Sequence, residues 1–201
     1  MIRKQIDRRT LLGRAASLAA AASLCNCGLG NVARAAETEG VHPMLPSLTP
    51  GAPKLEPVNF QLLGPGGTSL ALSTMRGRPF ILHLWATWCP PCRLELPALN
   101  AFLEKTGSAV PVIPVGVASP LPKVMMFLAQ GNLPHIAPWT LGQHEFSQWF
   151  TSGEPSLPMT CVIDAQGRLR ASVEGEMAWN APDAQAALEK ILSGLQAPKP
   201  A

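Results

Sequence analysis

The stretch Phe80–Cys92, "FILHLWATWCPPC", constrains the fold more than any other part of this chain of 201 residues. Its first residues form a nearly continuous apolar run, which is typical of a strand buried on both faces of a sheet. Two cysteines follow, separated by Pro90 and Pro91, and proline is favoured in the first turn of a helix. The stretch therefore predicts a buried strand followed directly by a helix, which runs from about Pro90 to Lys105 and has Cys89 at its N-terminus.

The segments on either side predict one alternating α/β unit. The expected arrangement is a central mixed sheet flanked by helices on both faces, with an added N-terminal β-hairpin. The other expected elements are two short strands within 58–72, a buried strand within 110–118, a helix capped by Ser119 and ended by Gly131, a helix at 143–151, a hairpin formed by "MTCVID" and "RLRASVEG", and a final helix capped by Asn180.

The pair Cys89 and Cys92 allows three interpretations: half of a zinc site, a structural disulfide, or a redox-active pair. A structural zinc site needs four ligands, and the four histidines show no suitable spacing. At a helix N-terminus the free N–H groups stabilise an anion, so the pKa of the Cys89 thiol should fall. Cys89 would then attack a partner's disulfide, and Cys92 would resolve the mixed disulfide. The setting favours redox chemistry, with no metal and no cofactor besides the disulfide itself.

The longer stretch "FILHLWATWCPPCRLELPAL" resembles the TlpA/ResA-like family of exported thiol–disulfide oxidoreductases, which have the thioredoxin fold. The resemblance runs from about Val58 to Leu195 and includes "LPMTCVIDAQGRL". It identifies a family and leaves the partner open.

The resemblance implies roles for residues around the cysteines. Glu95 is expected to carry protons to or from the Cys92 sulfur, and a solvated helix carboxylate is the alternative. Pro158 matches the cis-proline of the fold, with an ordinary trans-proline as the alternative. Leu157, just before it, is expected to pair its backbone with a client segment. Trp88 is expected at the rim of the site, in contact with the client.

Two further residues lie in the predicted strands. His83 stands where thioredoxins themselves have Asp and where this family often has Asn. We expect a hydrogen-bonded core histidine, and the alternative is a neutral imidazole that accepts a proton beneath the cysteines. Cys161 lies in an apolar strand and is expected to be a buried, inert thiol.

The two prolines also bear on the direction of electron flow. They have no N–H, so the amide of Cys92 is the main donor left for the Cys89 sulfur. Fewer donors mean a less stabilised thiolate and a less stabilised reduced form. We therefore expect a reducing couple, nearer to thioredoxin at about −270 mV than to the oxidant DsbA at about −120 mV.

Residues 1–35 have the pattern of an export signal, with a basic start, a short alanine-rich stretch and small residues before Ala36. "DRRTLL" resembles a twin-arginine signal, and a Sec signal is the alternative.

The formal charge of the chain is +3, but 6 of its 16 Lys and Arg and 1 of its 13 Asp and Glu lie in residues 1–35. The rest carries 10 basic and 12 acidic residues, which excludes a basic nucleic-acid-binding surface. We expect a periplasmic protein, tethered to the membrane if the signal is not cleaved.

Composition sets the remaining boundaries. Prolines recur through residues 36–57 without apolar periodicity, which predicts an extended tether outside the core. Residues 58–195 should form the thioredoxin-like domain, and 196–201 a disordered tail.

Together the motifs predict an exported thiol–disulfide oxidoreductase that reduces client proteins through Cys89 and Cys92. The resemblance implies clients such as apocytochrome c or a copper-site assembly protein, and a membrane-embedded thiol electron donor. We expect a monomer. The alternatives are a thiol peroxidase, for which Thr87 is one residue too near the nucleophile, and a Sco-type copper chaperone, for which the two intervening prolines give the wrong cysteine separation.

Overall fold

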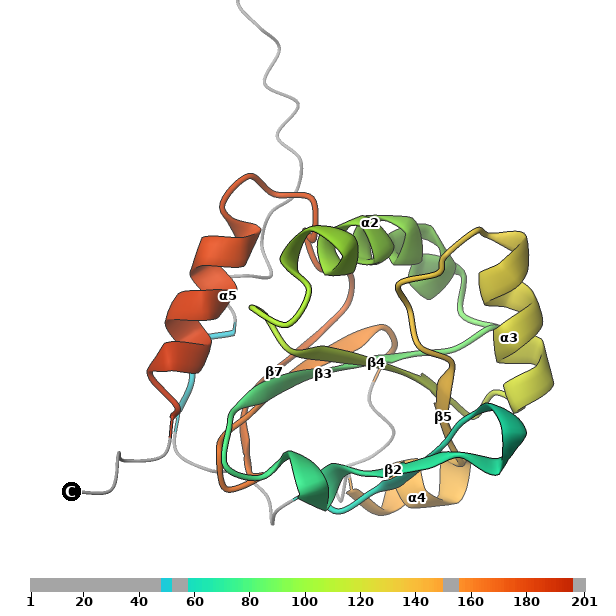
Figure 1. The fold of residues 1–201 in the computed structure, drawn as a ribbon, viewed down its shortest axis with the longest axis horizontal. Helices are drawn as coiled ribbons and strands as arrows, with labels where there is room; N and C mark the ends of the chain where they lie inside the picture. Colours follow the sequence, from blue (N-terminus) through green and yellow to red (C-terminus); the bar gives the residue numbers. More distant parts are fainter. Residues whose placement is uncertain (1–47, 52–57, 150–155, 197–201) are drawn as a thin grey trace, which may run out of the picture. The chain divides into compact units, whose positions relative to one another are not determined.

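The computed structural model describes residues 48–51, 58–149 and 156–196. All described residues belong to the compact unit Thr38–Ala201. The expected export signal, most of the 36–57 segment and the tail after Gln196 lie outside the described residues (Figure 1).

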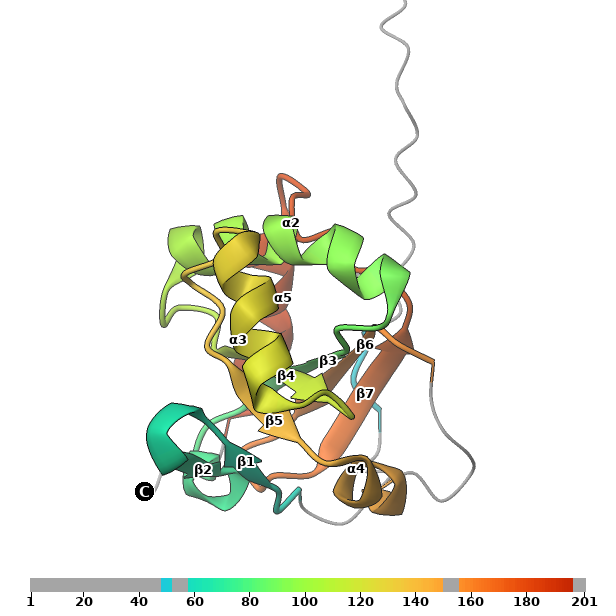
Figure 2. The same cartoon turned by 90° about the vertical axis from the view of Figure 1, so that its right-hand side faces the viewer.

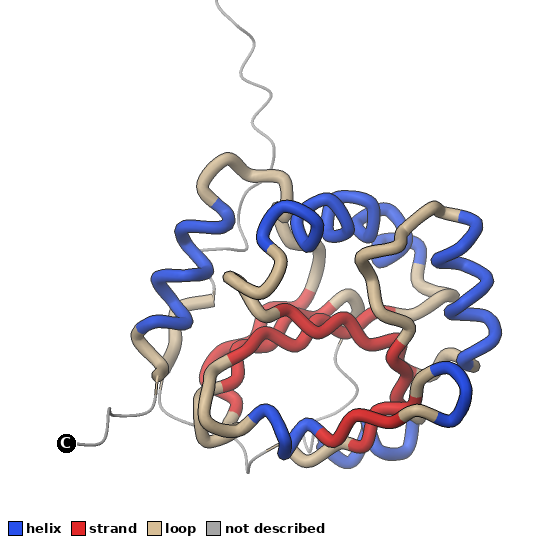
Figure 3. The backbone as a smooth tube through the Cα atoms, in the orientation of Figure 1, coloured by secondary structure: helices blue, strands red, loops and turns tan. Residues whose placement is uncertain are grey.

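Within the described residues, seven strands form one mixed sheet (Figures 1 and 3). They lie in the order β2-β1-β5-β4-β3-β6-β7, and β3 is parallel to β4 and antiparallel to β6. The strands β1 and β2 form an antiparallel pair at one edge. Their bounds are β1 Gln61–Leu63, β2 Ser69–Ala71, β3 Phe80–Trp85, β4 Val112–Val117, β5 Trp139–Leu141, β6 Met159–Ile163 and β7 Leu169–Glu174.

Helices cover both faces of the sheet, as expected from the sequence. Their bounds are α2 Pro90–Thr106, α3 Leu121–Gln130, α4 Gln143–Trp149 and α5 Ala184–Ser193, with short 3-10 turns at Pro65–Gly67 and Leu72–Met75. Both views of the ribbon place α4 on the opposite side of the sheet from α2 (Figures 1 and 2). Among the described residues, no helix has both the length and the apolar character needed to cross a bilayer.

The strand β3 is buried along its whole length, and successive side chains point to opposite faces. Ile81 and Trp85 join a core with apolar residues of α2, α3 and α5. Leu82 and Leu84 join a second core with Phe146 of α4. The same alternation brings residue 83 to the face that α2 covers.

The bounds confirm some local predictions and correct others. The helix after the cysteines and the hairpin of β6 and β7 lie where they were predicted. Ser119 does not cap α3, because Pro120 occupies that position and the Ser119 hydroxyl accepts a hydrogen bond from the Thr87 N–H at 3.0 Å. Asn180 does not cap α5 either, since this helix begins after Asp183.

Part of the expected tether is packed against the domain. Leu48 is fully buried in the core on the α2 side of the sheet. The Gly51 N–H donates to the carbonyl of Arg170 at 3.1 Å, and the Arg170 Nε donates to the Gly51 carbonyl at 2.7 Å. Arg170 belongs to β7, the strand at the sheet edge, so residues 48–51 cover backbone that an edge strand leaves unpaired. The prediction of a tether outside the core is wrong for these residues.

Candidate active site

The cysteine pair lies where the central strand passes into α2. Cys89 is the N-cap residue of the helix, and Pro90 and Pro91 are its first two residues. A disulfide joins Cys89 to Cys92, with the two Cα atoms 5.4 Å apart. The N–H of Cys92 donates to the Cys89 sulfur at 3.3 Å. The sequence predicts that the Cys92 N–H is the main donor to the Cys89 sulfur, and the structure shows this hydrogen bond.

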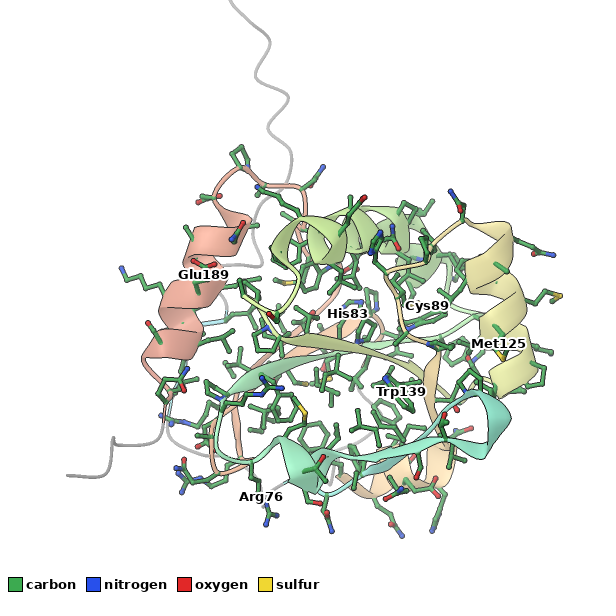
Figure 4. The ribbon with its side chains drawn as sticks, viewed as in Figure 1. Arg76, His83, Cys89, Met125, Trp139 and Glu189 are labelled. Carbon is green, nitrogen blue, oxygen red and sulfur yellow. A yellow bond between two sulfur atoms is a disulfide. The ribbon has the colours of Figure 1, made fainter. Side chains whose placement is uncertain are left out.

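The two cysteines differ in how a partner can reach them. Cys89 is 4% exposed, whereas Cys92 is 0% exposed. Cys89 nevertheless lines an open cleft of about 330 Å³. Figure 4 labels Cys89, at the start of α2. A sulfur of another molecule can approach Cys89 through this cleft, while Cys92 is shielded behind it.

The walls of the cleft come from segments far apart in the sequence. Trp88 is 62% exposed, and its indole N–H donates to the Ala118 carbonyl at 3.1 Å, which fixes the ring at the rim. The lining is mostly apolar, which suits an apolar segment of a protein partner. The lining residues are Trp88, Cys89, Pro90, Pro91, Val117, Ala118, Gln143, Phe146, Ser156 and Leu157.

The segment before β6 brings backbone to the reactive sulfur. The peptide bond between Leu157 and Pro158 is cis, as the family resemblance implied. The carbonyl oxygen of Leu157 lies 3.5 Å from the Cys89 sulfur. After reduction this oxygen can accept a hydrogen bond from the thiol, which favours the neutral form. Binding of a client by Leu157 and a role of Pro158 in the reaction stay predictions.

Glu95 lies one turn beyond Cys92 on the buried side of α2. The pKa of its carboxyl is raised to about 7. Burial is the largest cause, hydrogen bonds from the Trp179 side chain and the Met177 backbone lower the pKa, and the charge of Glu176 raises it. The Trp179 indole N–H donates to Glu95 Oε1. The interpretation of Glu95 as a solvated helix carboxylate is wrong, and a proton can be gained or lost here near neutral pH.

His83 lies beneath α2 and contacts the same carboxyl. Figure 4 labels it on the central strand. Its Nε2 is 3.6 Å from Glu95 Oε1, its Nδ1 is 3.0 Å from the Thr160 hydroxyl, and its ring meets that of Trp179 edge to face. Burial lowers the pKa of His83 to about 3, so the imidazole is neutral at physiological pH. The expectation of a hydrogen-bonded core histidine is confirmed.

The third cysteine of the domain is separate from this site. Cys161 is fully buried with the core on the α4 side of the sheet, and burial raises the pKa of its thiol far above the usual range. The expectation of a buried thiol is confirmed. In the described part of the chain, no three His, Cys, Asp or Glu side chains lie close enough together to hold a metal ion.

Trp179 and Thr160 complete the polar cluster around Glu95, and neither is marked as functional by the sequence. Trp179 is 84 residues from Glu95, and Thr160 is 77 residues from His83. A tryptophan and a threonine in apolar surroundings carry no local signal for such contacts. A buried histidine in a strand was the one available hint that polar partners must exist.

The chain is similar to known proteins over this region. The family model described as Redoxin matches residues 45–188. The thiol:disulfide interchange protein DsbE of Pseudomonas fluorescens is 28% identical over 117 residues, which are 57% of this chain and 63% of that protein. The thiol-disulfide oxidoreductase ResA of Bacillus thuringiensis is 28% identical over 122 residues, which are 60% of this chain and 69% of that protein. The chain thus spans about two thirds of the length of these relatives.

Among solved structures, a thioredoxin-family thiol:disulfide interchange protein from Chlorobium tepidum aligns with a TM-score of 0.53 at 22% identity. The alignment covers 72% of this chain and 97% of that one. The thioredoxin-like fold predicted from the sequence is therefore confirmed.

Proposed function

The chain belongs to the Redoxin family, and we propose that it is an exported thiol–disulfide oxidoreductase that reduces client proteins through Cys89 and Cys92. Its resemblance to ResA-like proteins, expected from the sequence, is confirmed by the relatives named ResA and DsbE. The observation that carries the proposal is the asymmetry of the pair: Cys89 borders an open cleft at a helix N-terminus, and Cys92 lies buried behind it.

The proposed reaction proceeds in two exchanges. In the reduced protein, the Cys89 thiolate attacks one sulfur of the client's disulfide, and the other client sulfur leaves as a thiolate. The Cys92 thiol then gives its proton to Glu95 and attacks the Cys89 sulfur, which releases the second client thiolate. Two electrons pass to the client, and the protein is left with the Cys89–Cys92 disulfide seen in the structure.

The reducing direction of this exchange rests on the surroundings of the Cys89 sulfur. One backbone N–H donates to it, from Cys92, and the Leu157 carbonyl faces it. Both features favour a thiol over a thiolate, and a poorly stabilised thiolate makes a dithiol a better electron donor.

The clients and the electron donor are proposed from the family resemblance. A cytochrome c precursor, whose haem-attachment motif Cys-x-x-Cys-His forms a disulfide when oxidised, presents a suitable pair of sulfurs. A copper-site assembly protein with paired cysteines is a second client of the same chemistry. The disulfide left after each cycle needs two electrons, and a membrane-embedded thiol protein would supply them in the periplasm. We propose that the protein acts as a monomer.

The experiment uses a synthetic peptide with the oxidised Cys-x-x-Cys-His motif and insulin as a second substrate. The reduced protein is mixed with each, and the thiols released in the substrate are counted. We expect reduction by the wild type, none by Cys89→Ser, and a stalled mixed disulfide between Cys89 and the peptide in Cys92→Ser. Cys161→Ala serves as the matched control, because that thiol lies on the far face of the sheet and should not affect turnover.

Two outcomes contradict the proposal. In the first, Cys89→Ser still reduces the peptide. In the second, the equilibrium favours the oxidised peptide, so the protein acts as an oxidant. A Cu(I) titration in parallel tests the copper-chaperone alternative, which predicts tight binding without peptide reduction.

A further inference from the structure

A polar side chain that the proposed reaction does not use lies directly beneath the cysteine helix. His83 has no solvent exposure, and its Nε2 is a buried nitrogen without a hydrogen-bond partner among the described residues. The polar atom that it faces is Oε1 of Glu95, at 3.6 Å. Buried polar atoms are almost always paired, so a near-contact of this kind between two buried polar groups asks for an explanation.

The second ring nitrogen of His83 also has a polar contact, with a hydroxyl that can donate or accept. Nδ1 lies 3.0 Å from the Thr160 hydroxyl. If that hydroxyl donates to Nδ1, the hydrogen of the neutral ring is on Nε2 and points toward Glu95. The Trp179 indole N–H already donates to the same oxygen, Oε1. A movement of about 0.5 Å would bring the His83 N–H into a normal hydrogen bond, so that Oε1 accepts from both rings.

The other oxygen of the carboxyl is in a different position. Oε2 of Glu95 is buried without a hydrogen-bond partner of normal geometry among the described residues, although the Met177 main chain also interacts with this carboxyl and lowers its pKa. When two donors hold Oε1 of a carboxyl, the proton binds to and leaves from the other oxygen, Oε2. Since Glu95 follows Cys92 by three residues on the same side of α2, this oxygen belongs to a carboxyl that shares the buried face of the helix with the resolving cysteine.

We propose that His83 is a positioning residue for the thiol–disulfide exchange: with Trp179 it holds Oε1 of Glu95, so that Oε2 takes the proton from the Cys92 thiol in the resolving step. This inference rests on the proposed function for its purpose, but the positioning itself is a property of the protein without a client. In the exchange, the S–H bond of Cys92 breaks, an O–H bond forms on Oε2, and the imidazole stays neutral throughout.

The titratable groups around Glu95 in the described chain come from three elements. His83 faces it from β3 and stays neutral, because burial lowers its pKa to about 3. Glu176, after β7, raises the pKa of Glu95 by charge repulsion. Cys89 and Cys92, at the start of α2, do not titrate while they form the disulfide. A titration of the oxidised protein therefore has no contribution from the two cysteines, and Glu95→Gln separates the Glu95 carboxyl from Glu176.

The test follows the indole N–H of Trp179 in ¹⁵N–¹H spectra of the oxidised full chain as the pH changes. This N–H donates to Glu95, so its chemical shift reports the state of the carboxyl, and the titration should disappear in Glu95→Gln. His83→Asn keeps a polar group near Thr160 but does not reach Glu95. It should raise the midpoint by about one pH unit, because the carboxylate loses a donor. His83→Gln, whose amide reaches the place of Nε2, should restore the midpoint.

Two more variants keep the test decisive. Thr160→Val removes the hydroxyl that fixes the tautomer and should move the midpoint upward by a smaller amount, even if His83→Asn does not fold. Glu176→Gln is the matched control that should shift the midpoint in the opposite direction. Loss of this exposed negative charge should lower the midpoint of the Glu95 titration. The pH profile for reduction of the peptide should shift with the midpoint in each variant.

The proposal is overturned if folded His83→Asn and Thr160→Val both titrate at the wild-type midpoint, or if His83→Gln behaves like His83→Asn. The titration uses no client, so its result is independent of the proposed function. A midpoint that shifts in a protein that reduces no peptide would remove the proposed function and keep the positioning of Glu95 by His83.

Discussion

The main-chain N–H of Cys92 donates to the sulfur of Cys89 within the first turn of α2, at 3.3 Å. An N-cap side chain usually accepts from the N–H of the second or third helical residue. Here Pro91 occupies the second position and has no N–H, so the third residue, Cys92, supplies the donor. The reactive sulfur therefore lies at the positive end of the helix. Because both residues between the cysteines are prolines, fewer N–H groups stabilise a negative charge on this sulfur than two other residues would provide.

Replacing Pro91 by alanine should make the couple more oxidising. The new N–H can donate to the Cys89 sulfur, and a hydrogen bond to a charged group contributes about 1.5 kcal/mol. Because the reduced form gains this stabilisation, the reduction potential should rise by about 30 mV. The measurement is the equilibrium with a glutathione buffer. Pro90→Ala, at the first helical position, restores an N–H that does not point at the N-cap side chain and should shift the potential by less. Equal shifts for both variants would contradict this explanation.

The raised pKa of Glu95 makes the stability of the oxidised protein depend on pH. The carboxyl titrates at about 7 in the folded state and at 4.5 in the reference state, so the folded protein holds the proton more tightly. The contribution of this carboxyl to the free energy of unfolding is complete below pH 4.5. It is lost as the pH rises through 7, which lowers the free energy of unfolding by about 3 kcal/mol. Glu95→Gln should remove this part of the pH dependence. Urea unfolding of both proteins at pH 4 and pH 8 measures it, and an unchanged difference between the two pH values would contradict the burial of this carboxyl.

Much of the fold could be predicted because its signals are local. The apolar run of β3, the prolines that open α2 and the Gly167 turn between β6 and β7 each determine their structure within a few residues. The strand β5, Trp139–Leu141, has three residues, too few to show any periodicity. Residues 48–51 resemble a free tether in composition, and what orders them is a contact with Arg170, more than a hundred positions away.

The candidate site also has a part that could be predicted from local sequence and a part that could not. Cys89, Cys92 and Glu95 lie within two turns of one helix, so spacing and family resemblance were enough to place them together. The partners of Glu95 come from β3 and from the segment after β7, and no pattern in the sequence relates His83 to Trp179. Their contact depends on how the sheet, α2 and the loop before α5 pack, which is a property of the whole domain.

Trp88 should determine how well a client binds while contributing little to stability. Its ring is 62% exposed, lines the cleft beside Cys89 and is held by a hydrogen bond to Ala118. Trp88→Ala should raise the KM for the oxidised peptide about tenfold with a small change in kcat, because a buried aromatic contact contributes about 1–2 kcal/mol. The matched control is Leu94→Ala, since Leu94 is 78% exposed on the same helix end but does not line the cleft. A larger effect from Leu94 than from Trp88 would show that clients dock elsewhere.

Leu48 should stabilise the domain although it lies in the proline-rich segment before it. The side chain is fully buried in the core that α2 and α5 share, and Gly51 and Arg170 hold the segment in place. Leu48→Ala should lower the free energy of unfolding by about 3 kcal/mol, through lost burial and the cavity that remains. Leu63→Ala is the control, because Leu63 is 57% exposed and its loss should change stability by less than about 0.5 kcal/mol. Urea unfolding of the oxidised proteins compares them. If Leu48→Ala is as stable as the control, the segment does not belong to the folded core.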